Sequence, residues 1–495
     1  MAYDIILVPG CETLRESTLE RLEAFAAAGG KLVFLGDAPS LIDAKPDPRG
    51  VDLADRAILL PFNRVSVLAA VEEVREVEIR NSNGMLSGNL LHQLRTDGDD
   101  RWLFIAHGSE PYNKDISNRQ DIRITLRGTW TPTLYDTLTG DIRPVPYTTA
   151  NGMTVIEWGL YDYDSLLFKL SPAEEGSAYA APAAANTESC VLPIPNALPF
   201  TLHEPNVLLL DMAEFSLDGE DYAPAEELLR ADNACRRRLG WPSREGRVAQ
   251  PWTVAPEPIE HHIRLRFTIR SEIDLMGTEL ALEDAETAKI LLDGADVPST
   301  VTGWYVDKSI KKVAMPPIAA GEHKLEITLP FGRRTNVEWC YLLGNFGVKV
   351  CGREATVISL PEKLGFGDIV PQGLPFYGGK LTYHTELDTK GGALTLRVPH
   401  YRAAVMAVHL DGEKIADLAY PPYRLGLGKP AAGRHQLDID IFVSRQNAFG
   451  PLHLSNSRAE WIGPNAWRTG GDSWTYEYNF FREGITSVFE VKEEK

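Results

Sequence analysis

Val405-Met-Ala-Val-His-Leu-Asp-Gly412, Tyr420-Pro-Pro-Tyr423 and Ala432-Gly-Arg-His-Gln-Leu-Asp-Ile-Asp-Ile-Phe442 form the stretch that decides the fold of this chain. A degenerate copy comes earlier, as Ala288-Lys-Ile-Leu-Leu-Asp-Gly294, Pro316-Pro317 and Ala320-Gly-Glu-His-Lys-Leu-Glu-Ile-Thr-Leu-Pro-Phe331. In both copies a strand ends in Asp-Gly, a proline-rich crossing follows, and Ala-Gly-x-His leads into an alternating strand. One supersecondary unit used twice predicts two related β-sandwiches in tandem, over residues 206–359 and 360–495.

Residues 1–100 carry a different pattern. Tyr3–Val8 has the composition of a buried strand, and Thr13-Leu-Arg-Glu16 has the form of a capping box that starts a helix. Gly29-Gly30 ends that helix, and Lys31–Leu35 is a second strand. A strand–helix–strand crossover implies parallel strands, so we expect a small α/β domain with a further helix at residues 65–74.

The hydrophobic period changes to two from Arg101 onward. Segments such as Asp121–Arg127 and Met153–Trp158 alternate apolar and polar residues between turn signals. We therefore expect a small antiparallel β domain at residues 101–170, followed by a linker at residues 171–205, which is rich in Ala, Pro and Ser at its start. The expected fold class is multi-domain and mainly β.

Charge excludes two classes of partner. The chain carries 50 Lys and Arg against 69 Asp and Glu, a net charge of −19, so we expect neither nucleic acid nor an anionic membrane surface as a partner. Its longest apolar runs have strand length, and its start does not have the pattern of a signal peptide. These features favour a cytoplasmic location.

The cysteines and histidines point to no reactive centre. Cys11, Cys190, Cys235, Cys340 and Cys351 are widely spaced, which favours free thiols and leaves a Cys340–Cys351 cross-link as the alternative. Cys11 is expected to be an ordinary loop cysteine.

His261 and His262 point to opposite faces of a strand and are expected to be structural. Because no motif for a phosphate, a dinucleotide or a metal occurs, we expect no cofactor and no metal.

Aromatic residues next to carboxylates are the remaining chemical signal. Such pairs suit sugars, because pyranose rings bury their C–H faces on aromatic rings while carboxylates take the hydroxyl groups. The candidate carbohydrate-binding residues are Trp304, Asp307, Tyr420, Tyr423, Trp461, Trp467 and Trp474. The candidate catalytic carboxylates, if the chain is an enzyme, are Glu338, Glu460 and Asp472. Large aromatics in β-sandwiches more often pack in cores, so loop residues of the Glu460–Tyr476 segment are the stronger candidates.

Several runs resemble known sequences. Tyr3-Asp-Ile-Ile-Leu-Val-Pro9 and Leu22-Glu-Ala-Phe-Ala-Ala-Ala-Gly-Gly-Lys-Leu-Val33 resemble the glutamine-amidotransferase-like accessory domain of bacterial glycoside hydrolases. Glu338–Val348, Gln372–Tyr383 and Ser444–His453 are similar to the C-terminal half of large enzymes related to the α-L-rhamnosidase family. The repeated Asp-Gly and Ala-Gly-x-His pattern is similar to the galactose-binding-like jelly rolls of those enzymes. The resemblance implies the portion that follows a catalytic (β/α)₈ barrel, and it transfers no catalytic residue.

Three hypotheses follow. The first is a carbohydrate-binding, accessory portion of a glycoside hydrolase that binds an oligosaccharide or polysaccharide or packs against a catalytic barrel. The second is a glycoside or ester hydrolase with a carboxylate site in a sandwich or inter-domain cleft. The third is a structural module that forms a homo-oligomer through its α/β domain.

Overall fold

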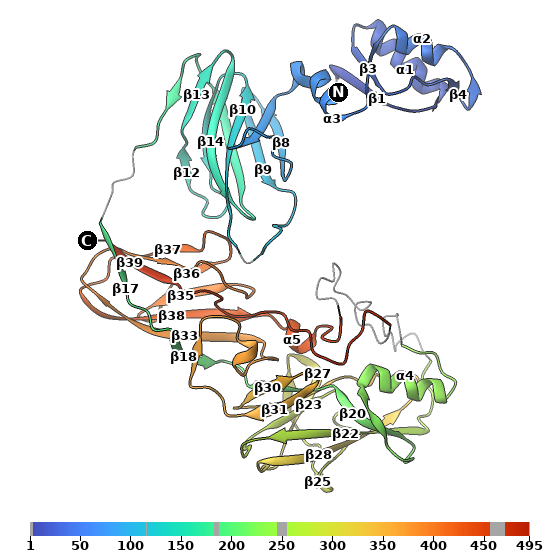
Figure 1. Ribbon diagram of the computed structural model, residues 1–495, viewed down its shortest axis with the longest axis vertical. Coiled ribbons are helices and arrows are strands. Elements are labelled where there is room, and N and C mark those ends of the chain that lie inside the picture. The colour runs from blue at the N-terminus through green and yellow to red at the C-terminus, as the bar shows by residue number, and fades with distance from the viewer. Residues whose placement is uncertain (1–2, 115, 183–187, 245–254, 456–470, 495) are drawn as a thin grey trace. The chain divides into compact units, whose positions relative to one another are not determined.

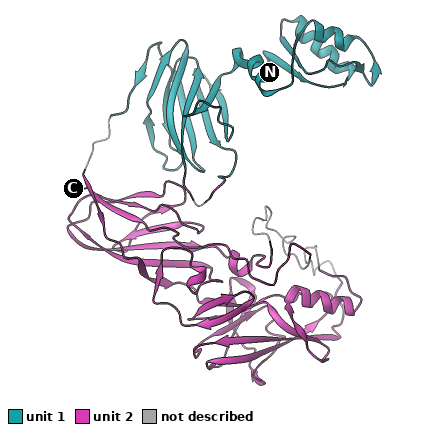
Figure 2. Cartoon of the chain, in the orientation of Figure 1, with its two compact units in different colours: residues 1–111, 118–184 teal, residues 112–117, 185–495 magenta. Residues whose placement is uncertain are grey.

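The computed structural model of the protein describes residues 3–114, 116–182, 188–244, 255–455 and 471–494. The chain forms two units, residues 1–111 with 118–184 and residues 112–117 with 185–495 (Figure 2). Antiparallel strands dominate the described residues of both units (Figure 1). The expected multi-domain, mainly β fold class is confirmed.

The first unit begins with a parallel α/β region. β1 (Ile5–Pro9) and β3 (Lys31–Leu35) pair in parallel, and α1 (Glu16–Ala27) connects them. β6 (Ile58–Leu60) joins β3 in parallel and completes a three-stranded sheet. The predicted crossover is therefore confirmed. The remaining elements here are β2 (Thr13–Leu14), β4 (Leu41–Ile42), β5 (Lys45–Pro46), α2 (Arg49–Asp55), α3 (Arg64–Val71) and the 3₁₀ turn η1 (Glu72–Val74).

The predicted capping box at the start of α1 is wrong. The residue preceding the helix is Arg15, and no side chain caps the helix there. Thr13 instead lies in an extended strand and its hydroxyl accepts a hydrogen bond from the Ala44 amide. Glu16 accepts two hydrogen bonds from the Arg49 guanidinium, at 2.6 and 2.8 Å. A distant arginine has therefore taken the carboxylate that a capping box would use locally.

An antiparallel sandwich completes the first unit. Its first sheet has the order β16 (Ala178–Tyr179), β13 (Tyr147–Ala150), β14 (Met153–Tyr161), β10 (Arg119–Arg127) and β7 (Val77–Asn81). Its second sheet has the order β12 (Ile142–Pro144), β11 (Trp130–Tyr135), β15 (Ser165–Pro172), β9 (Asp100–His107) and β8 (Leu90–Asp97). Ile105, Ile124, Ile156 and Phe168 are fully buried in the core that the two sheets share.

This sandwich extends beyond the predicted 101–170 segment in both directions. β7 and β8 precede residue 101, and β16 follows residue 170. β8 pairs with β9 along its full length, yet only Leu90 of β8 is buried. A strand at the edge of a sheet with both faces exposed lacks the apolar alternation that marks buried strands, so its sequence gives no strand signal.

The second unit contains a sandwich built from two separate parts of the chain. One sheet has the order β17 (Ser189–Leu192), β39 (Glu490–Glu494), β34 (Leu394–Arg397) and β37 (Arg424–Gly428). The other has the order β32 (Lys363–Gly365), β18 (Ala197–Leu202), β33 (Gly379–Thr389), β38 (Gly433–Val443), β35 (Met406–Leu410) and β36 (Glu413–Leu418). The short helices η3 (Val370–Gln372) and α5 (Gln446–Phe449) connect its strands. We call it the C-terminal sandwich.

Part of the predicted 171–205 linker thus forms strands β17 and β18 of the C-terminal sandwich. Each strand is short and has few buried side chains. Their pairing partners, β39 and β33, lie far along the chain, so local sequence cannot show the pairing.

The sandwich that lies between β18 and β32 in sequence is here called the inserted sandwich. One sheet has the order β19 (Asn206–Leu210), β29 (Cys340–Gly344), β23 (Glu279–Leu282), β27 (Asp307–Ala314) and β26 (Val301–Tyr305). The other contains β21 (Ala223–Glu227), β20 (Met212–Leu217), β22 (His261–Ser271), β28 (Gly321–Phe331), β24 (Lys289–Leu292), β25 (Ala295–Val297), β30 (Gly347–Cys351) and β31 (Glu354–Ile358). α4 (Leu228–Arg238) follows β21, and the two sheets share one core.

The repeated sequence motif forms the same contacts in both sandwiches of the second unit. In the inserted sandwich, His323 Nδ1 lies 2.6 Å from Asp293 Oδ2, and the Lys324 amide donates to Asp293 Oδ1. In the C-terminal sandwich, His435 Nδ1 lies 2.6 Å from Asp411 Oδ2, with the same amide contact from the following residue. The turn aspartate of one hairpin thus holds the histidine that begins the neighbouring strand.

A third copy of this contact occurs where the sequence shows no full repeat. Asp218 has positive φ, precedes Gly219, and accepts from the His262 amide at 2.9 Å. His261 Nδ1 lies 2.7 Å from Asp218 Oδ2. The contact supports the structural role expected for His261.

These contacts make stability depend on pH. The hydrogen bond to Asp293 raises the pKa of His323, and the same bond lowers the pKa of Asp293. The contact of protonated His323 with Asp293 contributes its full stabilisation below the ordinary histidine pKa of about 6.5. This contribution is lost as pH rises through the pKa of His323 in the folded state. The lowered aspartate pKa contributes above about pH 4 and is lost in stronger acid.

We predict that His323→Gln lowers the free energy of unfolding by about 0.2–1 kcal/mol at pH near 5.5, and by less at higher pH, where wild type has lost the same contribution. Denaturant titrations of wild type, His323→Gln, Asp293→Asn and the double variant at about pH 5.5 and 8.5 measure the coupling. A coupling energy that is unchanged between the two pH values would contradict the ion-pair assignment.

Candidate functional site

A wide hollow lies on the outer face of the first unit's sandwich. Its volume is about 970 Å³, and its floor is formed by strands β7, β10 and β14. On β10, Ile122 and Ile124 are buried in the core, so the residues between and beside them face outward. The alternation that builds the core therefore also decides which side chains line the hollow.

Six charged side chains line the hollow: Arg80, Arg119, Arg123, Glu78, Asp121 and Glu157. They form pairs, because Arg119 Nε donates to Asp121 Oδ1 at 3.0 Å and Arg123 Nη1 lies 3.9 Å from Glu157 Oε1. Arg80 donates to Glu78. Burial acts to raise the pKa of Glu78, but its arginine neighbours outweigh burial and hold the pKa below its ordinary value. The lining therefore offers donors and acceptors side by side.

Gly159 shapes the floor of the hollow. It lies opposite Asp121 in the β10–β14 register. A Cβ atom at this position would lie 2.3 Å from Nε of Arg119. The glycine therefore lets the Arg119 side chain lie across the sheet, and a larger residue would displace it.

Two aromatic residues of β14 also line the hollow. Tyr161 is half-buried. Trp158 packs edge-on against Phe168, with ring centroids 6.4 Å apart, and the Arg143 guanidinium lies 5.3 Å from its ring. The hollow thus combines apolar ring surface with paired charges.

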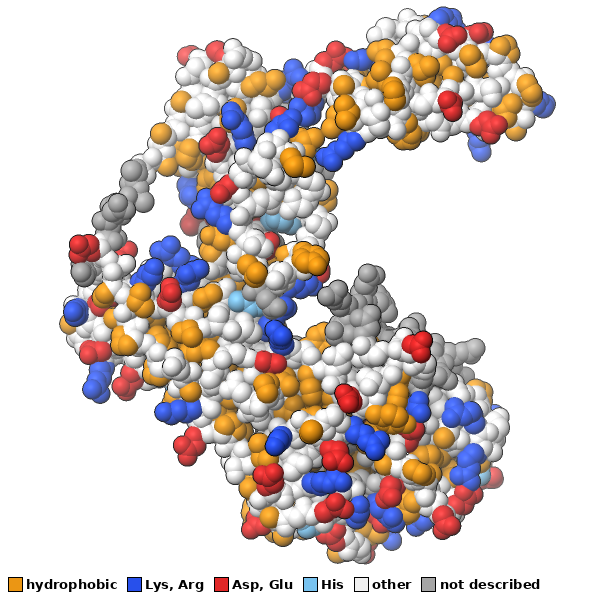
Figure 3. Space-filling model, in the orientation of Figure 1, with side chains coloured by type: hydrophobic (Ala, Val, Ile, Leu, Met, Phe, Trp, Pro, Cys, Tyr) orange, Lys and Arg blue, Asp and Glu red, His pale blue; other side chains and the backbone are white. Residues whose placement is uncertain are grey.

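The sequence did not single out this hollow. Its lining residues look like an ordinary solvated strand face, and charged residues are interspersed over much of the surface (Figure 3). The available signal was the spacing of Arg119, Asp121 and Arg123 on one strand face, with Gly159 in a neighbouring strand.

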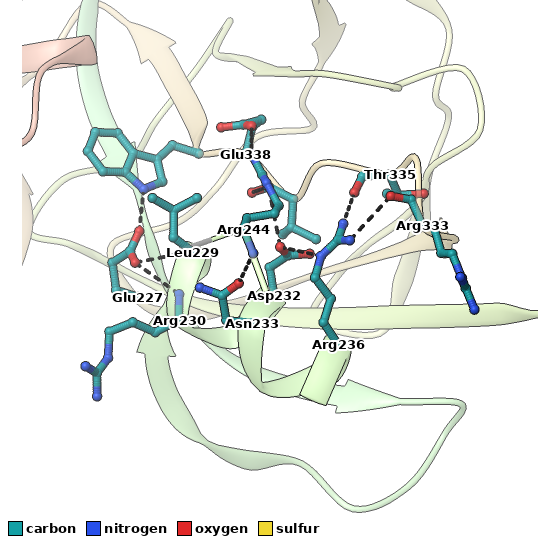
Figure 4. Close-up of polar contacts among 12 residues, drawn as sticks. Glu227, Leu229, Arg230, Asp232, Asn233, Arg236, Arg244, Arg333, Thr335 and Glu338 are labelled. Carbon is teal, nitrogen blue, oxygen red and sulfur yellow. Dashed lines mark hydrogen bonds and ion pairs between the residues drawn. The ribbon is translucent and has the colours of Figure 1, made fainter. Parts of the chain in front are cut away.

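The predicted catalytic residue Glu338 lies in an ion-pair network instead (Figure 4). Arg244 Nη2 lies 2.6 Å from Glu338 Oε1 and Nη1 lies 3.5 Å from Asp232 Oδ2. Asp232 is fully buried and also pairs with Arg236 at 2.9 Å. Burial raises the pKa of Asp232 despite both arginines. These contacts join α4 to the segment before β29, which favours a structural role for Glu338.

Trp474 lies in a second network, and its ring is in contact with protein. The Arg230 guanidinium lies 4.3 Å from the Trp474 ring, and His453 stacks on that ring with centroids 5.8 Å apart. Asp472 is exposed, and its backbone carbonyl accepts from the Ser455 hydroxyl at 2.6 Å. Glu460, Trp461 and Trp467 lie outside the described residues.

The buried carboxylates beside Trp474 were not predicted. Glu227 Oε1 accepts from Trp339 Nε1 at 2.8 Å, and its Oε2 accepts from the first amides of α4. Asp211 accepts from the Tyr478 hydroxyl at 2.6 Å and from His453 Nε2 at 3.0 Å. These contacts attach the C-terminal segment to the inserted sandwich. The sequence signal was weak because the five residues are far apart in the chain.

Contacts to both ring nitrogens favour the charged form of His453. Its Nδ1 faces the Thr475 carbonyl at 3.0 Å and its Nε2 faces Asp211, so both nitrogens face acceptors. Burial alone would lower the pKa of His453, but the bond to Asp211 outweighs burial and raises it. Burial raises the pKa of Glu227 to about 7.

The other predicted binding residues lie in two separate places, the β26–β27 hairpin and the connection between β36 and β37. Trp304 is 52% exposed on β26, and Asp307, the first residue of β27 (Asp307–Ala314), accepts from the Ser309 amide and hydroxyl. Tyr420 is 49% exposed in the C-terminal sandwich. Tyr423 packs against the core residue Tyr401, with ring centroids 4.9 Å apart. Trp304 and Tyr420 therefore remain exposed candidates, whereas Tyr423 contributes to packing.

The five cysteines form no cross-link. All five are free thiols, so the alternative Cys340–Cys351 cross-link is not formed. Burial raises the pKa of Cys11, which favours the neutral thiol. Within the described ranges, no group of three or more His, Cys, Asp or Glu side chains is placed to hold a metal ion. No helix of the described segments is long and apolar enough to cross a membrane.

Comparison with known proteins gives matches to solved structures alone, because no family model and no curated protein matches. The rhamnosidase from Novosphingobium sp. PP1Y is 12% identical with a TM-score of 0.45, over 99% of this chain and 33% of that chain. The α-L-rhamnosidase from Streptomyces avermitilis, complexed with L-rhamnose, is 12% identical with a TM-score of 0.19, over 74% and 36%. The α-L-fucosidase isoenzyme 2 from Paenibacillus thiaminolyticus is 10% identical with a TM-score of 0.24, over 35% and 41%.

The solved structures similar to this chain therefore include glycoside hydrolases. The chain spans about a third of the length of the Novosphingobium rhamnosidase. Similarities of this size transfer no residue and no activity.

The contacts of Glu227 and His453 should make the stability of the fold depend on pH. The pKa values of Glu227 and His453 are both raised in the folded state. As pH rises, the unfolded state therefore loses these protons at lower pH than the folded state does. Stability from this network is therefore greatest in mild acid and falls as pH rises from about 4.5 to above 7.

We predict that Glu227→Gln reduces this pH dependence, whereas Glu227→Ala lowers stability by roughly 1–3 kcal/mol because it leaves the Trp339 indole N–H and the α4 amides unpaired. Thermal unfolding followed by tryptophan fluorescence from about pH 5 to 8 measures both effects. Glu220→Gln, which removes an exposed partner of Arg238, is the control. Equal pH dependence in wild type and Glu227→Gln would contradict the assignment.

Proposed function

We propose that this chain is a carbohydrate-binding, accessory portion of a glycoside-hydrolase-type protein, and that the hollow over β7, β10 and β14 is its binding site. The hollow itself is the observation that carries the proposal. The glycoside-hydrolase part of the proposal comes from the sequence resemblance described above.

The size of the hollow supports an oligosaccharide as its ligand. Ligand pockets in proteins commonly have volumes of about 300–1,000 Å³, and this hollow lies at the upper end of that range. The floor is a sheet surface whose strands run side by side, so a ligand of several rings can contact β10 and β14 together. An extended ligand fits such a surface better than a small compact one.

The chemistry of the lining supports a polyhydroxylated ligand. Each sugar hydroxyl is both a donor and an acceptor, so it can accept from a guanidinium and donate to a carboxylate at once. The Arg119–Asp121 pair on β10 offers a donor and an acceptor side by side, since Arg119 Nε lies 3.0 Å from Asp121 Oδ1. The Tyr161 ring offers apolar surface for the C–H face of a pyranose.

The hydrolase alternative has less support from the described residues. Arg244 binds Oε1 of the Glu338 carboxylate, which favours a structural role for this residue. Asp472 is exposed, and Glu460, the candidate nearest to it in sequence, lies outside the described residues. We therefore place binding ahead of hydrolysis.

We predict that Tyr161→Ala or Arg123→Ala weakens binding of the intact chain to its glycan at least about tenfold, or roughly 1.4 kcal/mol, because each removes a contact at the hollow. Calorimetric titration against rhamno- and galacto-oligosaccharides and plant polysaccharides measures the affinity. The matched control is Arg397→Ala, which removes an arginine of the second unit that lies 3.8 Å from Glu490 in a similarly exposed pair.

Two results would contradict the proposal. The first is no binding of any glycan by a folded chain. The second is binding that Tyr161→Ala and Arg123→Ala leave unchanged, since the ligand would then lie elsewhere. Trp304→Ala and Tyr420→Ala test the two exposed aromatic residues in the same assay.

A further inference from the structure

We infer that the hollow selects a neutral oligosaccharide over an acidic one, an inference that rests on the proposed carbohydrate binding at this face. The reason is the balance of charge on the lining. Three arginines and three carboxylates line the hollow, and its lining contains no lysine. The two signs therefore cancel over the binding face.

Each arginine of the hollow already has a carboxylate partner. Arg119 pairs with Asp121 along one strand, and Arg123 lies across from Glu157 on the neighbouring strand. The Arg80 partner, Glu78, is also held by Arg75 at 2.9 Å. A uronate or sulfate group that bound one of these arginines would therefore lie beside the carboxylate that already holds it.

An acidic group would also meet repulsion that a hydroxyl group does not. On β10, Asp121 lies two residues from both Arg119 and Arg123, and Glu157 of β14 lies directly opposite Arg123. An anion bound over either arginine therefore lies close to a carboxylate. Ionised groups of a ligand can only accept hydrogen bonds, whereas the lining carboxylates require donors. The net charge of −19 on the whole chain adds a weaker, longer-range repulsion.

A neutral hydroxyl can join the existing pairs without breaking them. A guanidinium has five N–H donors, and a carboxylate has about four acceptor positions, so a single ion pair leaves most of both unused. The exposed state of Arg119 and Asp121 keeps these positions open to a ligand, with side chains 57% and 61% exposed. Sugar hydroxyls therefore complete the hydrogen bonding of the pairs.

The position of the Arg119 side chain beside Asp121 depends on the absence of a side chain at Gly159. The Arg119 side chain occupies the space that a Cβ atom would need. A side chain at residue 159 would push the guanidinium away from the sheet and separate it from Asp121. We therefore expect Gly159→Ala to weaken binding several-fold although the substitution lies on the outer face.

The test compares glycans that differ in charge. The probes are neutral galacto-oligosaccharides, oligogalacturonate, and fully methyl-esterified oligogalacturonate. The ester has the same sugar backbone as oligogalacturonate, but its carboxyl groups carry no charge. Titrations of the intact chain are run from about 0.05 to 0.5 M salt, over which screening of exposed charges increases strongly. We expect neutral probes to bind at least about tenfold more tightly than the acidic probe, with affinities that change less than about twofold with salt.

A charge variant sharpens the comparison. Asp121→Asn with Glu157→Gln removes two negative charges from the hollow, and we expect it to gain salt-sensitive binding of oligogalacturonate. The control is Glu386→Gln with Asp388→Asn, which makes the same charge change on exposed positions of β33 in the C-terminal sandwich. Thermal unfolding of each variant checks that the fold is kept.

The outcomes separate the inference from the proposed function. Tighter, salt-sensitive binding of oligogalacturonate by wild type overturns the inference and leaves carbohydrate binding standing. No binding of any probe, at any salt concentration, overturns the proposed function and the inference with it. An equal gain of acidic binding in the control variant also overturns the inference, because the effect would then come from net charge and not from the hollow.

Discussion

The alternation of side chains along β-strands is the constraint on which both units depend. Once Ile122 and Ile124 are committed to the core, Arg119, Asp121 and Arg123 must face outward. The same rule separates core from surface in the sandwiches of the second unit. The hollow on the first unit is therefore a direct product of the pattern that folds it.

Carboxylates occur in two different environments in this chain. Asp211, Glu227 and Asp232 are almost completely buried and have protein partners, so they fix α4 and the C-terminal segment to the inserted sandwich. Asp121 and Glu157 are exposed, and their arginine partners leave hydrogen-bonding positions unused. Burial beside protein partners favours a structural role, whereas exposed pairs over a hollow are suited to a ligand.

The sequence predicted those parts of the fold that have local or repeated signals. The parallel crossover at β1 and β3 and the Asp-Gly and Ala-Gly-x-His repeat were both legible, since each lies within one continuous stretch. The strands β17 and β18 were not, because their partners are β39 and β33, far along the chain. β8 was missed for another reason, since an edge strand with two exposed faces has no apolar alternation.

The candidate site was less predictable than the fold. Aromatic residues beside carboxylates identified Trp474 and Glu338, but packing placed both in protein contacts. The hollow depends on the cross-strand registry of β10 and β14 and on the missing side chain of Gly159. Single-sequence spacing cannot give registry between strands that are joined by long connections.

Amide hydrogen exchange of the intact chain, with and without a neutral galacto-oligosaccharide, is the most direct test of carbohydrate binding at the hollow. The account predicts that added protection is concentrated in β10 and β14 of the first unit. Protection confined to the β26–β27 hairpin of Trp304, to the β36–β37 connection of Tyr420, or to the segment around Trp474 would contradict it.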